Sequence, residues 1–136
     1  MKRLVVDEDK RVGPWIAERL DEPLPECFRT IGLEENGNLI AAVLYESFFP
    51  EFCLIHVAAS PCKRWMTKDM LRLTFLYPFR QLGLIKLYGP VRVSNTQAQR
   101  FDEHLGFIRE QVIPKGYKGK EDLIIYSMTA DQCRFI

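Results

Sequence analysis

The stretch that decides the fold is Asn95 to Phe107, NTQAQRFDEHLGF. Its apolar residues recur at intervals of three and four positions: Ala98, Phe101 and Leu105. Residues with this spacing share one face of a helix. Asn95 stands where a helix N-cap is expected, and Gly106 stands where a helix ends in a left-handed residue. The stretch therefore predicts a helix over 95–105, with an apolar strand before it and another after it.

Apolar patterns outside this stretch predict seven strands and two further helices. The strands are expected at 3–6, 28–33, 39–45, 53–59, 84–93, 107–113 and 123–128. The first of these helices is expected to begin near 11–13, and the second to cover about 67–82. The strand at 53–59 is apolar at consecutive positions, which is typical of a central strand covered on both faces.

Turn-forming residues fix several connections between these elements. Asn36-Gly37 predicts a tight hairpin turn between the second and third strands. Pro14 is expected in the first turn of its helix, capped by Asp7 or Asp9, because proline is tolerated there. Pro78 predicts a kink or an early helix end, and Gly89-Pro90 predicts a bulge or bend in its strand.

The composition is that of one globular domain, which we expect to span residues 1–136. The chain has 19 basic and 18 acidic residues, so net charge favours neither a nucleic-acid nor a membrane partner. No apolar run reaches the roughly 18 residues of a membrane span, and the charged start of the chain is unlike a signal peptide. We therefore expect a cytoplasmic protein.

The cysteines are few and widely separated in the sequence: Cys27, Cys53, Cys62 and Cys133. Their spacing fits neither a Cys-x-x-Cys motif nor a zinc finger, so we expect no metal site. In a cytoplasmic protein such thiols are expected to be reduced and structural.

The helix ending in Leu-Gly-Phe, together with the order of the other elements, resembles the GCN5-related N-acetyltransferases (GNAT). The resemblance extends over nearly the whole chain, although only one helix precedes the hairpin where the family usually has two. It implies an α/β (α+β) fold with a mixed central sheet of about six to seven strands, antiparallel early and parallel in the middle, and about three to four helices. The stretch 64–83, RWMTKDMLRLTFLYPFRQLG, and the Cys-Arg-Phe tail at 133–135 also resemble small phage and prophage members of that family.

This resemblance implies a function: direct transfer of an acetyl group from acetyl-CoA to an amine on a small molecule or a protein. In the family, the donor lies where two central parallel strands separate, commonly at a bulge. The pantetheine arm would then lie along the backbone of Val57, Ala58 and Ala59, beginning near His56. Asn95 would face it from the opposite strand.

The pyrophosphate loop of the family, Arg/Gln-x-x-Gly-x-Gly/Ala, corresponds to 64–69 here. Arg64 matches, but Thr67 and Asp69 replace both glycines. Amides at a helix N-terminus bind anions whatever their side chains. Lys63, Arg64 and Lys68 add positive charge, and the Thr67 hydroxyl is a candidate cap or phosphate ligand.

The catalytic groups are less clearly marked. His56 is a candidate base for the amine proton, because an imidazole suits that task near neutral pH; Glu46 and Glu51 are alternatives acting through water. The tyrosine that protonates the leaving thiolate in many family members is replaced by Asp102, which we expect on the solvent face of its helix. Other tyrosines are candidate substitutes: Tyr88, Tyr117 and Tyr126.

Two other functions remain open at this stage. One is an inert GNAT-fold binding or structural protein of phage origin, which the altered loop and the missing tyrosine favour. The other is an acyltransferase that modifies nucleic acid and would need a basic surface, with candidates Arg72, Arg80, Lys115, Lys118 and Lys120. A homodimer is a further expectation, in which the apolar end Phe135-Ile136 packs on a neighbour. A phage-encoded protein would act in the host cytoplasm.

Overall fold

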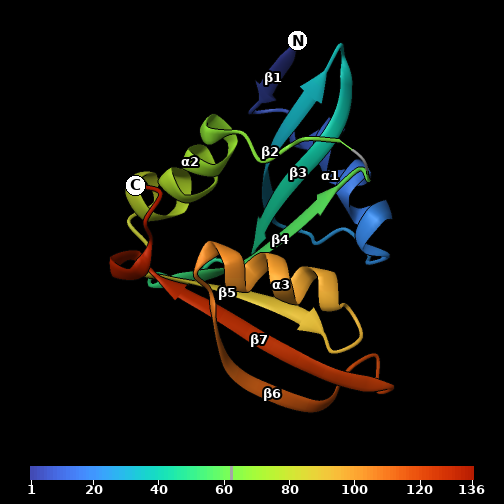
Figure 1. Ribbon diagram of the computed structural model, residues 1–136, viewed down its shortest axis with the longest axis vertical. Helices are drawn as coiled ribbons and strands as arrows, with labels where there is room; N and C mark the ends of the chain where they lie inside the picture. Colours follow the sequence, from blue (N-terminus) through green and yellow to red (C-terminus); the bar gives the residue numbers. More distant parts are fainter. Residues whose placement is uncertain (62) are drawn as a thin grey trace.

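The computed structural model describes residues 1–61 and 63–136 (Figure 1). Its strands are β1 Lys2–Val5, β2 Phe28–Glu35, β3 Asn38–Glu46, β4 Phe52–Ala59, β5 Lys86–Arg92, β6 Ile108–Tyr117 and β7 Glu121–Thr129. Its helices are α1 Asp9–Leu20, α2 Lys68–Leu76 and α3 Thr96–Leu105. A π-helical turn at Tyr77–Gln81 continues α2, and a short 3₁₀ turn covers Ala130–Gln132. Within this part of the chain, no helix is long and apolar enough to cross a membrane.

The strands form one mixed sheet in the order β1-β2-β3-β4-β5-β7-β6. Neighbouring strands are antiparallel except for β4 and β5, which run parallel at the centre. Parallel neighbours need a crossover connection, and α2 supplies it. The predicted fold class, a mixed sheet that is antiparallel early and parallel in the middle, is confirmed.

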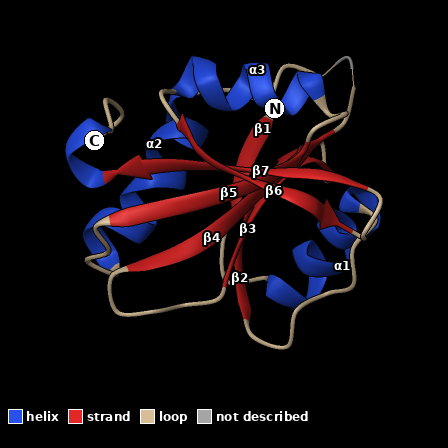
Figure 2. Cartoon of the chain, turned by 90° about the horizontal axis from the view of Figure 1, so that it is seen from below, coloured by secondary structure: helices blue, strands red, loops and turns tan. Residues whose placement is uncertain are grey.

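Helices cover both faces of the sheet, with α2 and α3 on one side and α1 on the other (Figure 2). Alternate residues of the central strands therefore belong to different cores. On the α2 side, Val43 and Tyr45 pack with Met70 and Phe75. On the α1 side, Ala42 and Leu44 pack with Val12 and Ile16. Both cores hold the central strands from which the site is built.

The local signals that depend on a few residues are confirmed. Asn36 and Gly37 both have positive φ, +52° and +86°, as a two-residue hairpin turn requires. Asn95 caps α3, because its side-chain oxygen accepts a hydrogen bond from the Ala98 amide at 3.1 Å. Gly106 ends that helix with φ +108°. The kink or early end predicted at Pro78 is present as the π-helical turn.

The start of α1 was predicted wrongly. The helix begins at Asp9, so Pro14 lies inside it and not in its first turn. Neither predicted aspartate caps it: Glu8 is the N-cap residue and has no side-chain cap. The Asp9 carboxylate instead accepts hydrogen bonds from the amide and hydroxyl of Thr30, at 2.9 and 2.7 Å. Asp9 therefore binds Thr30 of β2 and does not cap its own helix.

Other differences concern the later strands and the end of the chain. β6 reaches Tyr117 and β7 starts at Glu121, so strand structure extends into the polar segment expected as a loop, with Tyr117 opposite Glu121 after an irregularity in the register. Phe135 stacks on Phe75 with ring centroids 5.2 Å apart. The apolar end of the chain, Phe135 and Ile136, therefore packs on the core of its own chain and stays partly exposed. Cys27, Cys53 and Cys133 are free thiols, while Cys62 lies outside the described residues.

Candidate active site

The site begins where β4 and β5 separate. Ladder pairing between these parallel strands covers only three residues of each, ending at Leu54 and Tyr88. Beyond that point β4 continues to pair with β3 up to Ala59, and β5 continues to pair with β7 up to Arg92. The facing edges of the two strands therefore diverge while their outer edges stay paired.

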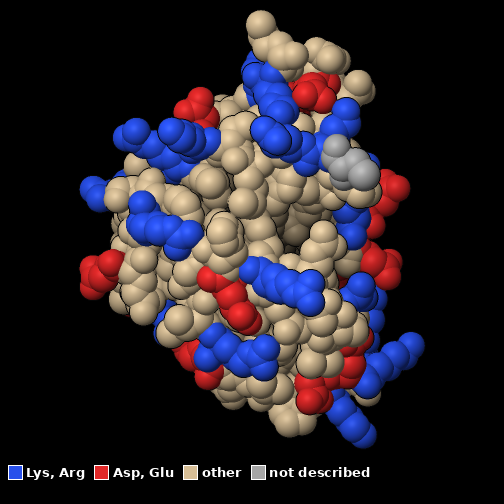
Figure 3. All heavy atoms as spheres, viewed as in Figure 1, with Lys and Arg blue, Asp and Glu red and all other residues tan. Residues whose placement is uncertain are grey.

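A cavity of about 590 Å³ occupies this divergence and extends to both sides of the sheet. Residues from α1 and the segment after it, from β3, β4 and β5, and from α2 and α3 line it. Figure 3 shows that this face of the molecule is hollowed at its centre, with Lys and Arg side chains gathered above the hollow. The volume is in the range of small-molecule sites.

No bulge accompanies the divergence, contrary to what the family resemblance implies. The β3–β4 register runs without a shift from Glu46 opposite Leu54 to Ala41 opposite Ala59. Nor does the predicted bulge at Gly89-Pro90 occur, because the β5–β7 register is continuous. Proline has no amide hydrogen for a ladder. Pro90 is accommodated on a strand whose pairing with β4 has already ended.

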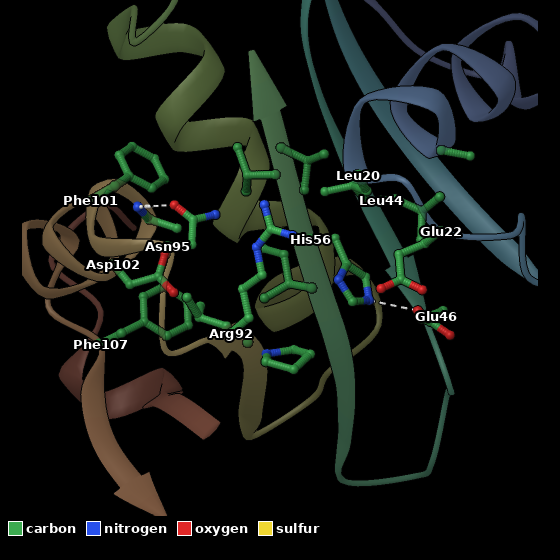
Figure 4. A pocket seen from close by; sticks show the side chains of 18 of the residues that line it. Leu20, Glu22, Leu44, Glu46, His56, Arg92, Asn95, Phe101, Asp102 and Phe107 are labelled. Atoms are coloured by element: carbon green, nitrogen blue, oxygen red, sulfur yellow. Dashed lines mark hydrogen bonds and ion pairs between the residues drawn. The ribbon is translucent and has the colours of Figure 1, made fainter. Parts of the chain in front are cut away.

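One wall of the cavity carries His56 of β4 and Glu46 of β3, which are diagonal neighbours across the ladder because His56 lies opposite Leu44 (Figure 4). The His56 Nε2 atom lies 2.6 Å from a carboxylate oxygen of Glu46. This hydrogen bond lowers the pKa of the Glu46 carboxyl below its ordinary value. An ionised carboxylate only accepts hydrogen bonds, so Nε2 is the donor, and in the neutral ring Nδ1 keeps a free lone pair.

The opposite wall belongs to α3 and carries Asn95 and Asp102. The prediction that Asp102 faces solvent is wrong: its carboxyl lines the cavity and is only partly accessible. Its Oδ2 atom lies 3.5 Å from the position of a Cβ built on Gly89, close to the point where the strands separate. Burial, with a smaller contribution from the charge of Glu103, raises the pKa of Asp102 to about 7.

The error about Asp102 has a physical cause. A helical pattern with apolar residues at 98, 101 and 105 places position 102 at the border of the apolar face. Whether such a border position meets solvent or a cavity depends on what packs beside the helix. The sequence did contain one signal, because Asp102 stands five residues before Phe107, at the position of the family tyrosine.

Three further residues, which no sequence pattern assigns to a site, line the cavity. Glu22 follows α1, and Figure 4 shows its carboxyl pointing toward His56. Arg92 ends β5 and points into the cavity between His56 and Asn95. Lys118, which was considered only for a basic surface, lies at the β6–β7 turn and forms an ion pair with Asp21 at 3.6 Å. These contacts join segments far apart in the sequence, so no local pattern reports them.

The predicted pantetheine residues are only partly brought to the cavity. Val57 lines it, with His56 before it on β4. The side chains of Ala58 and Ala59 do not line it, because they pack on the α1 core and the α2 core, respectively. Their predicted role needs only their backbone on the edge of β4 that faces away from β3, which β5 has left unpaired.

The predicted phosphate residues lie around the N-terminus of α2, outside the main cavity. Thr67 is the N-cap: its hydroxyl oxygen accepts a hydrogen bond from the Met70 amide at 3.1 Å. With Asp69 it lines a smaller hollow of about 430 Å³, together with Lys2 and Arg3 of β1. The two lysines and one arginine predicted for this region are exposed: Lys63, Arg64 and Lys68.

Their charges differ in availability. Lys63 forms an ion pair with Glu35 at 3.2 Å. Arg64 and Lys68 form no ion pair with the residues the structure describes. Between them, the Trp65 ring packs against Phe101 of α3, with centroids 5.1 Å apart. This contact ties the loop to the opposite wall of the cavity.

The fold is that of known acetyltransferases. A variant of the spermidine N-acetyltransferase SpeG from Vibrio cholerae superimposes with a TM-score of 0.75 at 17% identity, covering 99% of this chain and 96% of that one. The same enzyme in complex with CoA and spermine gives a TM-score of 0.72 at 18% identity, covering 97% and 96%. A protein described as a probable acetyltransferase gives 0.67 at 18% identity, covering 90% and 71%. No protein-family model and no curated protein matches the sequence.

The central sheet, the parallel pair and the order of helices thus follow the GNAT fold. At identities below 20%, the likeness concerns the fold alone. What the site does has to be argued from its own residues.

Proposed function

We propose that this protein is an acyl-CoA-dependent N-acyltransferase that moves an acetyl group from acetyl-CoA directly to a primary amine. One observation carries the proposal: β4 and β5 separate after Leu54 and Tyr88 and leave a cavity between a histidine–carboxylate pair and a protonatable aspartate. A base on one wall and an acid on the other are what an amine and a leaving thiolate require.

The donor would lie across the cavity from α2 to β4. Its phosphates would meet the N-terminal amides of α2 and the side chains of Arg64 and Lys68, which are exposed there. The pantetheine arm would follow the free edge of β4 along Val57 to Ala59, with Asn95 facing it. The solved neighbour that holds CoA supports this choice of donor.

His56 would take the proton from the attacking amine. Its Nε2–H donates to ionised Glu46, which leaves Nδ1 free to accept a proton as the carbon–nitrogen bond forms. The Glu46 carboxylate then stabilises the imidazolium and fixes the orientation of the ring. Backbone N–H groups on the open edge of β4 would stabilise the negative charge that develops on the thioester oxygen.

Asp102 would give a proton to the departing thiolate of CoA. Its carboxyl lies beside Gly89 at the point of strand divergence, and its pKa of about 7 keeps a large fraction protonated near neutral pH. It would thereby take the part that a tyrosine has in many proteins of this fold. The sulfur–carbon bond breaks, the thiolate accepts the Asp102 proton, and His56 releases the amine proton to solvent. Asp102 then regains a proton from solvent, which restores the site.

Calorimetric titration with acetyl-CoA and with CoA tests the donor site, and release of free thiol in the presence of a panel of primary amines tests the transfer. We expect micromolar binding that Arg64→Ala weakens about fivefold, as loss of one exposed phosphate contact would. Arg80→Ala is the matched control, because Arg80 is exposed at the other end of the same helical segment. Absence of donor binding by the unaltered protein would refute the proposal.

The second candidate is a CoA-binding protein without transfer activity. The observation in its favour is Asp69, whose carboxylate stands in the first turn of α2 where the family has a glycine. An anion there opposes a bound pyrophosphate unless Lys2 and Arg3 across the small hollow compensate it. Donor binding without thiol release for any amine would favour this candidate.

A further inference from the structure

Arg92 carries a positive charge inside the cavity that the transfer reaction does not use. It is the last residue of β5, and its side chain points into the cavity between His56 on one wall and Asn95 on the other (Figure 4). Solvent reaches it, so a ligand that enters the cavity can reach it too. A ligand bound between the two walls would therefore contact the Arg92 guanidinium.

Among the described residues, Arg92 has no carboxylate partner in direct contact. The pKa of Glu121 is lowered mainly by a hydrogen bond from Ser94 and to a smaller extent by the charge of Arg92, so this carboxylate lies near the guanidinium without pairing with it. Lys118, the other basic residue that lines the cavity, is paired with Asp21 at 3.6 Å. Of these two cations, only Arg92 is therefore free to bind a ligand.

The Arg92 guanidinium contacts one aromatic ring of the cavity lining. It lies 5.5 Å from the centroid of the Tyr117 ring, which comes from the β6–β7 hairpin and also lines the cavity. A cation–π contact of this kind restrains an arginine while leaving its other N–H donors free for an oxyanion. Less ordering entropy is then lost when an anion binds.

We propose that the acceptor carries an oxyanion, a carboxylate or a phosphate, a few bonds from its reactive amine, and that Arg92 binds this oxyanion. This inference rests on the proposed function and names the class of its acceptor. The amine would lie on the other side of the cavity, where Glu22 and Glu46 point toward His56. Opposite charges on the two sides of the cavity would orient an aminocarboxylate or an aminoalkyl phosphate with its amine toward the base.

The same arrangement disfavours a polyamine acceptor. A second ammonium group that extends from the amine subsite toward Arg92 would be repelled by its guanidinium. The proposal therefore differs from what the spermidine-acetylating neighbour of similar fold would suggest. The difference between the two acceptor classes is directly measurable.

Matched pairs of amines test it. The pairs are β-alanine with β-alaninamide, phenylalanine with phenylalaninamide, and phosphoethanolamine with ethanolamine, with spermidine added. Each is assayed for thiol release from acetyl-CoA and, independently of turnover, for calorimetric binding to the CoA-saturated protein. We expect the anionic member of at least one pair to have about tenfold higher kcat/KM and tighter binding. The pair that shows this preference identifies whether the oxyanion bound by Arg92 is a carboxylate or a phosphate.

Arg92→Gln removes the charge and keeps most of the side chain. It should abolish the preference within the responding pair, while Arg92→Lys should keep part of it. Arg80→Gln, on the surface, should leave it intact. Acetyl-CoA affinity should be unchanged in all three variants, which separates the acceptor proposal from the donor site.

Several results would overturn the inference. Equal kcat/KM and binding within every pair, or a preference for spermidine that Arg92→Gln increases, would show that the acceptor needs no anion. A loss of acetyl-CoA affinity in Arg92→Gln would make Arg92 a donor-binding residue. Failure of donor binding in the unaltered protein would instead refute the proposed function itself.

Discussion

The two edges of β5 show how one strand serves both stability and function. On the β7 side it is paired over all seven residues, from Lys86 to Arg92. On the β4 side it is paired over three, from Lys86 to Tyr88. The first half of β5 is therefore paired with a strand on both edges. The second half is paired with β7 only, and its edge toward β4 is unpaired; we call these the closed half and the open half.

This difference separates the residues that hold the sheet from those that form the site. Leu87 lies in the doubly paired half and is completely buried. Gly89 and Arg92 lie in the open half and line the cavity. An open strand edge inside a protein leaves backbone groups for a ligand, and the continuous ladder on the other edge keeps the strand in place. Substitutions in the two halves should therefore affect different quantities.

The largest expected effect is on activity, at His56 of β4, the strand that faces the unpaired edge of β5. His56→Ala removes the proposed base and should lower kcat/KM about 100- to 1,000-fold. Acetyl-CoA affinity and the unfolding midpoint should change little, because His56 lines a cavity. Steady-state kinetics and calorimetry measure both. His104→Ala, at an exposed position of α3, is the control. Unchanged kcat/KM in His56→Ala would show that His56 is not the base.

At the closed half, Leu87→Ala should act on stability. Removal of a fully buried leucine side chain is expected to lower the free energy of unfolding by about 3 kcal/mol, from lost burial and the cavity left behind. Ile85→Ala, two residues earlier and 60% exposed, should cost less than about 0.5 kcal/mol. Urea denaturation gives both values. Similar losses for the two variants would contradict the distinction between the two positions.

Asp102→Asn should change activity and stability in opposite directions. Asparagine cannot protonate the thiolate, so kcat should fall about tenfold at pH 6. The pKa of Asp102 is about 7, so the unaltered protein loses its acid as the pH rises through 7. The ratio of the two kcat values should then approach one by pH 9. A pH–rate profile from 5 to 9 measures this, and a constant ratio would exclude Asp102 as the acid.

The stability effect of the same substitution follows from proton linkage. The pKa of this carboxyl has its ordinary value of 3.8 in the unfolded chain and rises to about 7 in the folded protein. The folded state thus binds more protons between these values, and its stability falls as the pH rises from about 4 to 7. Asparagine stays neutral, so Asp102→Asn should be more stable by about 4 kcal/mol at pH 8 and by little at pH 4. Denaturation at both pH values tests the sign.

The smallest effect concerns the cap of α3, which holds the wall opposite β4. Asn95→Ala removes the acceptor of the Ala98 amide and should lower the free energy of unfolding by about 1 kcal/mol. Asn95→Asp keeps a capping oxygen and should preserve stability. If Asn95 also contacts the donor, Asn95→Ala weakens acetyl-CoA binding as well. Equal stability of the two variants would show that the cap contributes nothing.

Part of this site was predictable and part was not. The hairpin at Asn36-Gly37, the cap at Asn95 and the stop at Gly106 depend on conformations that a few adjacent residues favour, and all three are confirmed. His56 and Glu46 were named separately, but only the pairing of β3 with β4 shows that they share a hydrogen bond. The start of α1 was missed because Asp9 has a partner on β2.

The sequence by itself determined the elements, their order and the mixed sheet, because helical and strand periodicities and turn chemistry are written in neighbouring residues. The tertiary structure decided where β4 and β5 separate, which side of Asp102 is buried, and that Glu22, Arg92 and Tyr117 meet in one cavity. These residues come from segments up to about a hundred positions apart. Burial and charge at a site depend on which surfaces pack together, and only the folded chain specifies that.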